Sequence, residues 1–323
     1  MRGIAPARVV LHRVRMSRTL AMVTLCLLVG MAMVVAADAP KAKAPGKAPA
    51  PLRLPEGTQV RRDLPYVAGG HERQKLDLYL PAGVKDAPVV VWIHGGGWQN
   101  GSKDRTPAVA LLAHGYAVAS INYRLSSHAV FPAQIEDCKA AVRWLRAHAG
   151  EHGYDPNRIG VWGSSAGGHL VAMLGVTGDV KDFDTGENLA VSSRVQAVVD
   201  FFGPTDLLMM DAQSTANSRM KHNPPDSPES KLVGGAIQEN PGKTRRASPL
   251  TYVSNGDTPF LIVHGDQDPL VPVAQSEVFL AALKKAGVEA DLYVVKGGGH
   301  GGFQDPEVDG RVRAFLDRVL KGR

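Results

Sequence analysis

The stretch IGVWGSSAGGHLVAML, residues 159–174, decides the fold prediction. Its apolar beginning predicts a buried strand over Ile159–Gly163, and its Ala-, Leu- and Met-rich end predicts a helix over Ser165–Gly175. Between them, GSSAG fits the pattern G-x-S-x-G, in which a serine occupies a sharp strand-to-helix turn. Ser164 is out of register, because Trp162 stands where its leading glycine would be. The pattern therefore predicts Ser165 as a nucleophile lifted above a sheet.

Alternating strand and helix patterns flank this turn on both sides. Short β-branched and aromatic runs predict further strands over Lys75–Leu80, Pro88–Ile93, Tyr116–Asn122, Val195–Phe202, Pro259–Gly265 and Asp291–Val295. Apolar residues at helical spacing predict helices over Pro132–Ala149, Val273–Ala286 and Val308–Leu320. This alternation is typical of the α/β class with a mostly parallel sheet.

A run of three glycines follows the predicted strand Pro88–Ile93, in the sequence His94-Gly95-Gly96-Gly97-Trp98. Glycines leave backbone N–H groups free to point into a site with no side chain in the way. We expect the N–H groups of Gly96, Gly97 and Ala166 to form an oxyanion hole. His94 is interpreted as a structural hydrogen-bonding residue that fixes this loop.

A serine nucleophile needs a base, and His300 is the candidate among eleven histidines. It follows the last predicted strand in Gly297-Gly298-Gly299-His300-Gly301-Gly302, and a base that comes last fits the chain order Ser, Asp, His. We interpret the other histidines as solvated or structural, with His222 in a polar loop and His264 bracing a turn. His169, one helical turn after Ser165, is interpreted as a packing and hydrogen-bonding residue, although it is also a candidate for the pocket.

Two carboxylates compete for the role of the acid that orients the base. Asp266 and Asp268 both lie in HGDQDPLVP, directly after the strand Pro259–Gly265. Asp268 is deeper in the turn and is followed by a proline that restricts the backbone, so it is the preferred acid. Asp266 is interpreted as a carboxylate that caps the loop.

The N-terminus indicates export. Five arginines and no acids precede an apolar run over Leu20–Ala37, which predicts a signal peptide over residues 1–37, with a membrane anchor as the alternative. Residues 38–55 are rich in Ala, Pro and Lys and predict a linker, which leaves 56–323 as one catalytic domain. Export implies a periplasmic or extracellular location, and membrane contact only through an uncleaved N-terminus.

The net charge of +6 does not indicate a nucleic-acid partner. The five leader arginines supply +5, and Asp38–Pro51 adds +2, so the remaining residues carry −1. No basic patch remains on the predicted domain. Cys138 is the only cysteine besides Cys26 of the leader, so it has no partner for an internal disulfide. It lies on the predicted helix Pro132–Ala149 and is expected to be a small residue of the domain core.

Residues 205–257 interrupt the regular alternation. They contain NPPDSP, Gly234-Gly235 and Asn240-Pro241-Gly242, with few apolar repeats. Such a length exceeds an ordinary connection between elements, so we expect a functional excursion that shapes the pocket.

In their order, HGGGW, INYRLS, GSSAGGH, HGDQDPLVP and GGGHGG resemble the motifs of α/β-hydrolase esterases related to hormone-sensitive lipase. The chain is most similar to the bifunctional feruloyl and acetylxylan esterase-like (BD-FAE-like) branch, over about Gln59 to the C-terminus. The resemblance implies the α/β-hydrolase fold, with Ser165, Asp268 and His300 as the catalytic triad and Gly96 and Gly97 in the oxyanion hole. It also makes Tyr123 a candidate pocket residue, beside Trp98 and Ser164. The helical N-terminal cap of typical relatives is missing, which leaves the acyl preference to residues 205–257.

These patterns predict a serine carboxylic-ester hydrolase that works through an acyl-enzyme, without a metal or an organic cofactor. The expected substrates are acetyl or feruloyl esters of plant polysaccharide, or small aryl esters. A serine peptidase of the prolyl-oligopeptidase type shares the order of the triad, but such enzymes carry a propeller domain and no repeated blade pattern is present. A non-catalytic binding module is the third reading, and it conflicts with the presence of all three triad residues.

Overall fold

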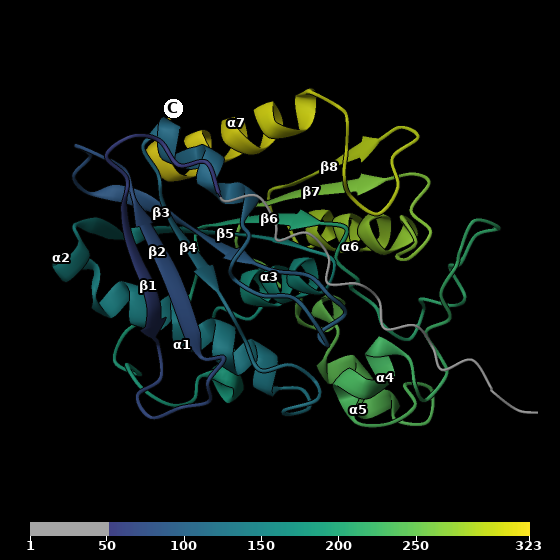
Figure 1. Ribbon diagram of the computed structural model, residues 1–323. Helices are drawn as coiled ribbons and strands as arrows, with labels where there is room; N and C mark the ends of the chain where they lie inside the picture. Colours follow the sequence, from purple (N-terminus) through teal and green to yellow (C-terminus); the bar gives the residue numbers. More distant parts are fainter. Residues whose placement is uncertain (1–51) are drawn as a thin grey trace, which may run out of the picture. The chain divides into compact units, whose positions relative to one another are not determined.

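The computed structural model describes residues 52–323 (Figure 1). The predicted signal peptide and residues 38–51 of the predicted linker lie outside the described residues. Leu52 and Leu54, which the composition assigned to the linker, pack against buried residues of the sheet domain. Among the described residues, Leu52–Arg323 form one compact unit. Within residues 52–323, none of the helices combines the length and apolar character needed to cross a bilayer.

Eight strands form one sheet in the order β1-β2-β4-β3-β5-β6-β7-β8. In chain order they are β1 (Gln59–Pro65), β2 (Lys75–Leu80), β3 (Ala87–Ile93), β4 (Ala117–Ile121), β5 (Tyr154–Ser164), β6 (Ala197–Phe201), β7 (Phe260–Gly265) and β8 (Ala290–Val295). β2 pairs antiparallel with β1 and β4, whereas every pair from β4 to β8 is parallel. The prediction of an α/β domain with a mostly parallel sheet is confirmed.

Helices cover both faces of this sheet (Figure 1). They are η1 (Pro107–His114), α1 (Ala133–Ala147), α2 (Ala149–His152), α3 (Ala166–Val176), η2 (Lys181–Phe183), α4 (Pro228–Val233), α5 (Pro241–Arg246), η3 (Pro249–Tyr252), α6 (Ala274–Lys285) and α7 (Glu307–Lys321). α1, α3 and α6 bury one face together with the larger apolar cluster, and η1 and α7 bury the other. Because parallel strands are covered on both faces, β3 and β7 are buried along their whole length.

β1 is the strand that the sequence patterns missed. Its sequence QVRRDLP is mostly exposed and carries three charged residues, so it has no apolar alternation to recognise. Its pairing with β2 is also irregular, since the register shifts between Arg61 and Leu64. Backbone pairing to a buried neighbour, rather than side-chain burial, defines this edge strand.

The loops that carry the predicted site follow four strands of the parallel part of the sheet, in which β6 separates β5 from β7. β3 leads into the glycine loop, β5 into Ser165, β7 into Asp268 and β8 into His300. These strands are parallel members of one sheet, so their carboxyl ends lie at the same edge. Ligands of open α/β sheets bind at this edge.

Candidate active site

Ser165 occupies the sharp turn between β5 and α3. It has φ 56° and ψ −121°, a strained conformation for a residue with a side chain. A Cβ atom on Gly163 would lie 2.3 Å from the carbonyl oxygen of Gly167, and one on Gly167 would lie 2.0 Å from that of Ile93. Both glycines of the motif are therefore required for the close approach of strand and helix that holds Ser165 in this conformation.

His300 is paired with Asp268. Its Nδ1 donates a hydrogen bond to Oδ2 of Asp268 at 2.7 Å. Oδ1 of the same carboxylate accepts from the backbone N–H groups of Leu270 at 2.8 Å and Val271 at 3.0 Å. Burial would raise the pKa of Asp268, but the hydrogen bonds from His264, His300 and Val271 outweigh it and hold this pKa well below its usual range. Asp268 is thus a fixed anion beneath the imidazole.

Asp266 does not contact His300. Its Oδ1 accepts a hydrogen bond from the backbone N–H of Gly297 at 2.7 Å, which ties the loop after β7 to the loop after β8. This is the loop-capping role expected from the sequence. His264 also braces its turn as predicted, because Nε2 donates to the carbonyl of Val271 at 2.9 Å and Nδ1 accepts from Ser276 Oγ at 2.7 Å.

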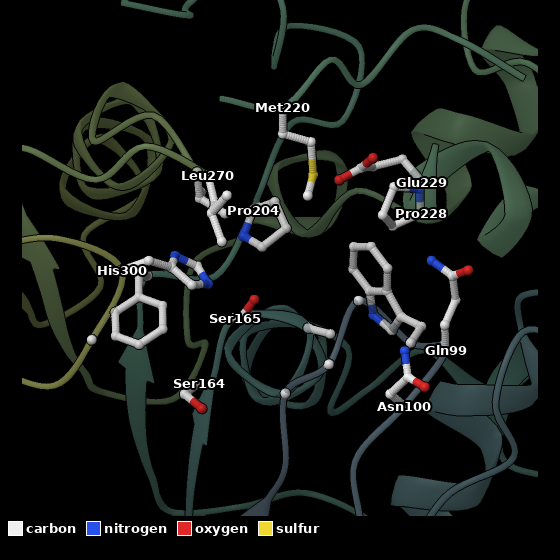
Figure 2. Close-up of a pocket in the computed structure, with 18 of the residues that line it drawn as sticks. Gln99, Asn100, Ser164, Ser165, Pro204, Met220, Pro228, Glu229, Leu270 and His300 are labelled. Atoms are coloured by element: carbon white, nitrogen blue, oxygen red, sulfur yellow. The ribbon is translucent and has the colours of Figure 1, made fainter. Parts of the chain in front are cut away.

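Ser165 and His300 line the same cavity (Figure 2). Figure 2 shows the hydroxyl of Ser165 directed into the cavity, with the ring of His300 beside it. The ring of Phe202 packs against the imidazole with a centroid separation of 4.5 Å. A serine hydroxyl, an imidazole and a buried carboxylate that accepts from the imidazole thus lie in one region, and these are the groups that proton transfer from a serine requires.

The glycine loop borders Ser165 closely. A Cβ atom on Gly95 would lie 2.8 Å from the carbonyl oxygen of Ser164. Gly96 and Gly97 have φ of 107° and 58°, and both line the cavity together with Ala166. Among the hydrogen bonds of residues 52–323, none uses the N–H of Gly96 or Gly97. These two donors remain available to an oxygen atom bound at Ser165.

His94 fixes the glycine loop from below. Its Nδ1 donates to the carbonyl of Gly95 at 2.8 Å, while Nε2 accepts from the guanidinium of Arg73 at 3.1 Å. Burial lowers the pKa of His94 to about 4, so the imidazole is neutral at neutral pH. The structural role expected for His94 agrees with these contacts.

Tyr123, a candidate pocket residue, does not line the cavity. Its side chain is fully buried, stacks on the ring of His94, and donates a hydrogen bond to the carbonyl of His94 at 3.1 Å. Tyr123 therefore supports the glycine loop from behind instead of facing a ligand. The sequence run INYRLS could place it near the loop but not on a particular side of it.

His169 also lies outside the pocket lining, which corrects its candidacy as a pocket residue. It is fully buried, accepts from Trp98 Nε1 at 3.2 Å, and donates from Nε2 to the carbonyl of Ala247 at 2.6 Å. Its interpretation as a packing and hydrogen-bonding residue is therefore confirmed. Trp98 and Ser164 do line the cavity, as predicted.

Residues 205–257 form one wall of the cavity, through Met220, His222, Pro228 and Glu229. The interpretation of His222 as a solvated histidine is wrong, because only 1% of the residue is exposed. Its Nδ1 lies 3.0 Å from Oε1 of Glu229. Burial opposes the charge of His222, but Glu229 and then Asp211 outweigh it and raise its pKa.

The cavity has a volume of about 620 Å³, within the usual range for small-molecule sites. Its wall is largely apolar, and Gln99, Asn100 and Glu229 contribute polar groups beside those of Ser165 and His300. Among the described residues, no group of three or more His, Cys, Asp or Glu side chains could hold a metal ion.

Sequence reasoning missed His222, Glu229, Phe202 and Met220 as residues of the site. Phe202 was expected only as the end of a strand, whereas Met220, His222 and Glu229 belong to an excursion without periodicity, and no spacing motif connects His222 with Glu229. The length of the excursion was the only signal, and it indicated the segment but not the side chains.

Comparison with known proteins connects this geometry to esterases. Residues 76–283 match the BD-FAE family model. The chain is 34% identical to esterase LipQ of Mycobacterium tuberculosis over 249 residues, which are 75% of this chain and 56% of LipQ. It is 31% identical to esterase LipC of the same organism over 294 residues, which are 85% of this chain and 71% of LipC.

A solved structure of a truncated carbohydrate esterase from gut microbiota superimposes with a TM-score of 0.75. It is 34% identical, and the match covers 81% of this chain and 96% of that chain. The domain accordingly has the α/β-hydrolase fold that the motifs implied. The chain spans little more than half the length of LipQ.

Proposed function

The chain belongs to the BD-FAE family of α/β-hydrolase esterases, and from this premise we propose that it hydrolyses carboxylic esters with Ser165, His300 and Asp268 as its catalytic triad. The observation that carries the proposal is the 2.7 Å hydrogen bond between His300 and the buried Asp268, in a cavity that also contains the strained Ser165. A base held by a buried anion is what a serine hydroxyl needs to become nucleophilic.

The reaction proceeds in two halves. Ser165 Oγ attacks the ester carbonyl carbon, and its proton moves to Nε2 of His300 while Nδ1–H stays bonded to Asp268. The carbonyl oxygen becomes an oxyanion that accepts hydrogen bonds from the N–H groups of Gly96, Gly97 and Ala166. Collapse of this intermediate breaks the bond to the alcohol, whose oxygen takes the proton from Nε2, and leaves an acyl group on Ser165.

The second half repeats these steps with water. His300 Nε2 accepts a proton from water, the hydroxide attacks the acyl carbon, and the bond to Ser165 Oγ breaks. Ser165 regains its proton from His300, and the carboxylic acid leaves.

Replacement of the nucleophile tests this assignment. We expect Ser165→Ala to lower the hydrolysis of p-nitrophenyl acetate to near the uncatalysed rate and to abolish labelling by a fluorophosphonate probe. Ser164→Ala serves as the neighbouring control and should still be labelled. Substantial turnover or labelling of Ser165→Ala would reject Ser165 as the nucleophile.

For the natural substrate we propose acetyl or feruloyl esters of plant polysaccharide, or small aryl esters. The family supports this, as does the likeness to a carbohydrate esterase from gut microbiota. Turnover of acetylated xylan, methyl ferulate and longer acyl esters, measured side by side, ranks these classes. Preference for a long aliphatic acyl ester would contradict the proposal.

Export is also part of the proposal. Arg2 to Arg18 carry positive charge ahead of the apolar run Leu20–Ala37, the arrangement of a signal peptide. N-terminal sequencing of the protein recovered from the periplasm or the medium should find a start near Asp38. Recovery of the intact N-terminus in the cytoplasm would contradict export.

A further inference from the structure

Glu229 is part of the cavity wall, and one oxygen of its carboxylate has no hydrogen-bond partner among the described residues. The residue is 3% exposed, and its Oε1 lies 3.0 Å from Nδ1 of His222. Oε2 is buried and has no hydrogen-bond partner among residues 52–323. Figure 2 shows the carboxylate directed from α4 toward the side of the cavity occupied by Met220. Buried polar atoms almost always have a hydrogen-bond partner, so we expect a donor for this oxygen, and the described residues do not supply one.

The position of Glu229 relative to His300 shows which half of an ester would meet it. The leaving oxygen must lie beside His300, because it takes its proton from Nε2. The acyl group then extends to the other side of Ser165. Figure 2 shows His300 and Glu229 on opposite sides of Ser165, so Glu229 faces the acyl half.

The rest of this wall favours an apolar acyl body. Trp98, Met220 and Pro228 line the same cavity as the carboxylate. An apolar wall with one acceptor fits an acyl group whose body is apolar and which ends in a hydrogen-bond donor. A carboxylate at the end of the acyl group would instead meet a like charge in a site of low dielectric constant.

We propose that Glu229 determines acyl specificity by accepting a hydrogen bond on Oε2 from a hydroxyl group at the far end of the acyl chain. Oε1 lies within ion-pair distance of Nδ1 of His222, and the loop that carries His222 is fixed by Asp211, which accepts from the backbone N–H of His222 at 2.8 Å. This inference rests on the proposed ester hydrolysis, and it assigns a residue that the triad mechanism does not use.

Two substrates that differ by one hydroxyl group test it. For the wild type, kcat/KM for methyl 4-hydroxycinnamate should exceed that for methyl cinnamate by about 10-fold or more, since a hydrogen bond to a charged acceptor contributes that much. Methyl 4-carboxycinnamate should be the poorest of the three. The unsubstituted ester is the smaller one, so a preference for the hydroxylated ester has no steric origin.

Glu229→Gln should lower the ratio of the two kcat/KM values several-fold, because a neutral amide oxygen is a weaker acceptor than a carboxylate. Electronic effects of the hydroxyl on the ester itself cancel when the two enzymes are compared. Glu239→Gln, at an exposed position of the same excursion, is the matched control and should keep the wild-type ratio.

Activity on p-nitrophenyl acetate separates the two proposals. A wild type that cleaves this ester but shows no preference for the hydroxylated cinnamate, or cleaves neither cinnamate, overturns the role of Glu229 and leaves ester hydrolysis in place. An unchanged ratio in Glu229→Gln overturns it as well. A folded wild type inactive on every ester overturns the proposed function. If Glu229→Gln fails to fold, the wild-type ranking of the hydroxy, unsubstituted and carboxy esters decides the question.

Discussion

Asp268→Asn, compared with Asp266→Asn, separates the two carboxylates that follow β7. In the native protein Oδ2 of Asp268 accepts from His300 at 2.7 Å and lies 3.3 Å from Nε2 of His264, while Oδ1 accepts from two backbone N–H groups. An asparagine keeps its carbonyl toward the backbone donors and turns its NH₂ toward the two imidazoles. His300 must then accept at Nδ1 and carry its proton on Nε2, where the proton of Ser165 has to go.

The magnitude follows from this reversed tautomer. The corresponding change in trypsin lowers kcat by about 10⁴, which equals roughly 5 kcal/mol of transition-state stabilisation. The loss of stability should be smaller, because the bonds from Leu270 and Val271 to Oδ1 remain. Asp266→Asn retains an acceptor for the N–H of Gly297, so it should cost only ~1 kcal/mol of folding free energy and leave kcat close to wild type.

The assay is kcat for p-nitrophenyl acetate, with thermal unfolding of each variant as the check on folding. Asp268→Asn should be folded and nearly inactive, and Asp266→Asn should be folded and active. If Asp268→Asn kept kcat within 10-fold of wild type, the buried anion would not orient His300. If Asp266→Asn were the inactive variant, the assignment of the two carboxylates would be reversed.

Three further changes probe the supports of the site. Gly167→Ala would place a Cβ 2.0 Å from the carbonyl oxygen of Ile93. The free energy of unfolding, measured in urea, should fall by at least ~2 kcal/mol, and most of the activity should be lost. Gly310→Ala is the control, because it has open space around it and should lower neither quantity. Asp200 is fully buried, which raises its pKa from 3.8 to about 6, so its protonated form stabilises the fold below about pH 4 and this contribution is lost as the pH rises through 6. Asp200→Asn should therefore be more stable than wild type by about 3 kcal/mol at pH 8 and as stable as wild type at pH 4. If the variant and the wild type melted at the same temperature at pH 8 as well as at pH 4, Asp200 would not carry a buried charge. Tyr123→Phe leaves the carbonyl of His94 without its buried donor, so unfolding should show a loss of about 1–2 kcal/mol and kcat should fall several-fold; an unchanged kcat would mean that Tyr123 does not support the glycine loop.

The central strands could be predicted because a strand that is buried on both faces is a continuous apolar run in the sequence. Pro88–Ile93 and Pro259–Gly265 were expected as strands and match β3 and β7 within one residue. The four loops of the site follow from the same fact, since parallel strands bring their carboxyl ends to one edge. β1 has no such apolar run, because its charged side chains are exposed and only its backbone is paired.

Contacts between loops were predicted less well, because they depend on three-dimensional packing that no spacing encodes. Asp268 could be preferred over Asp266 from its place in the turn, but their separate partners, His300 and Gly297, became visible only in the structure. Tyr123 was a candidate for the pocket, but its ring stacks on that of His94 instead.

The pair of His222 and Glu229 illustrates why substrate choice is harder to predict than chemistry. The triad must satisfy fixed geometry, so glycines, a proline and neighbouring strands mark its residues. The wall that contacts the acyl group needs only one polar side chain at the position of the substrate's polar group, and almost any loop can supply such a side chain. In this chain that loop is anchored by Asp211, whose two oxygens accept from the backbone N–H groups of His222 and Asn223. Because Asp211 fixes the loop that carries His222, a change in the length of this excursion would alter acyl preference while Ser165, His300 and Asp268 stayed in place.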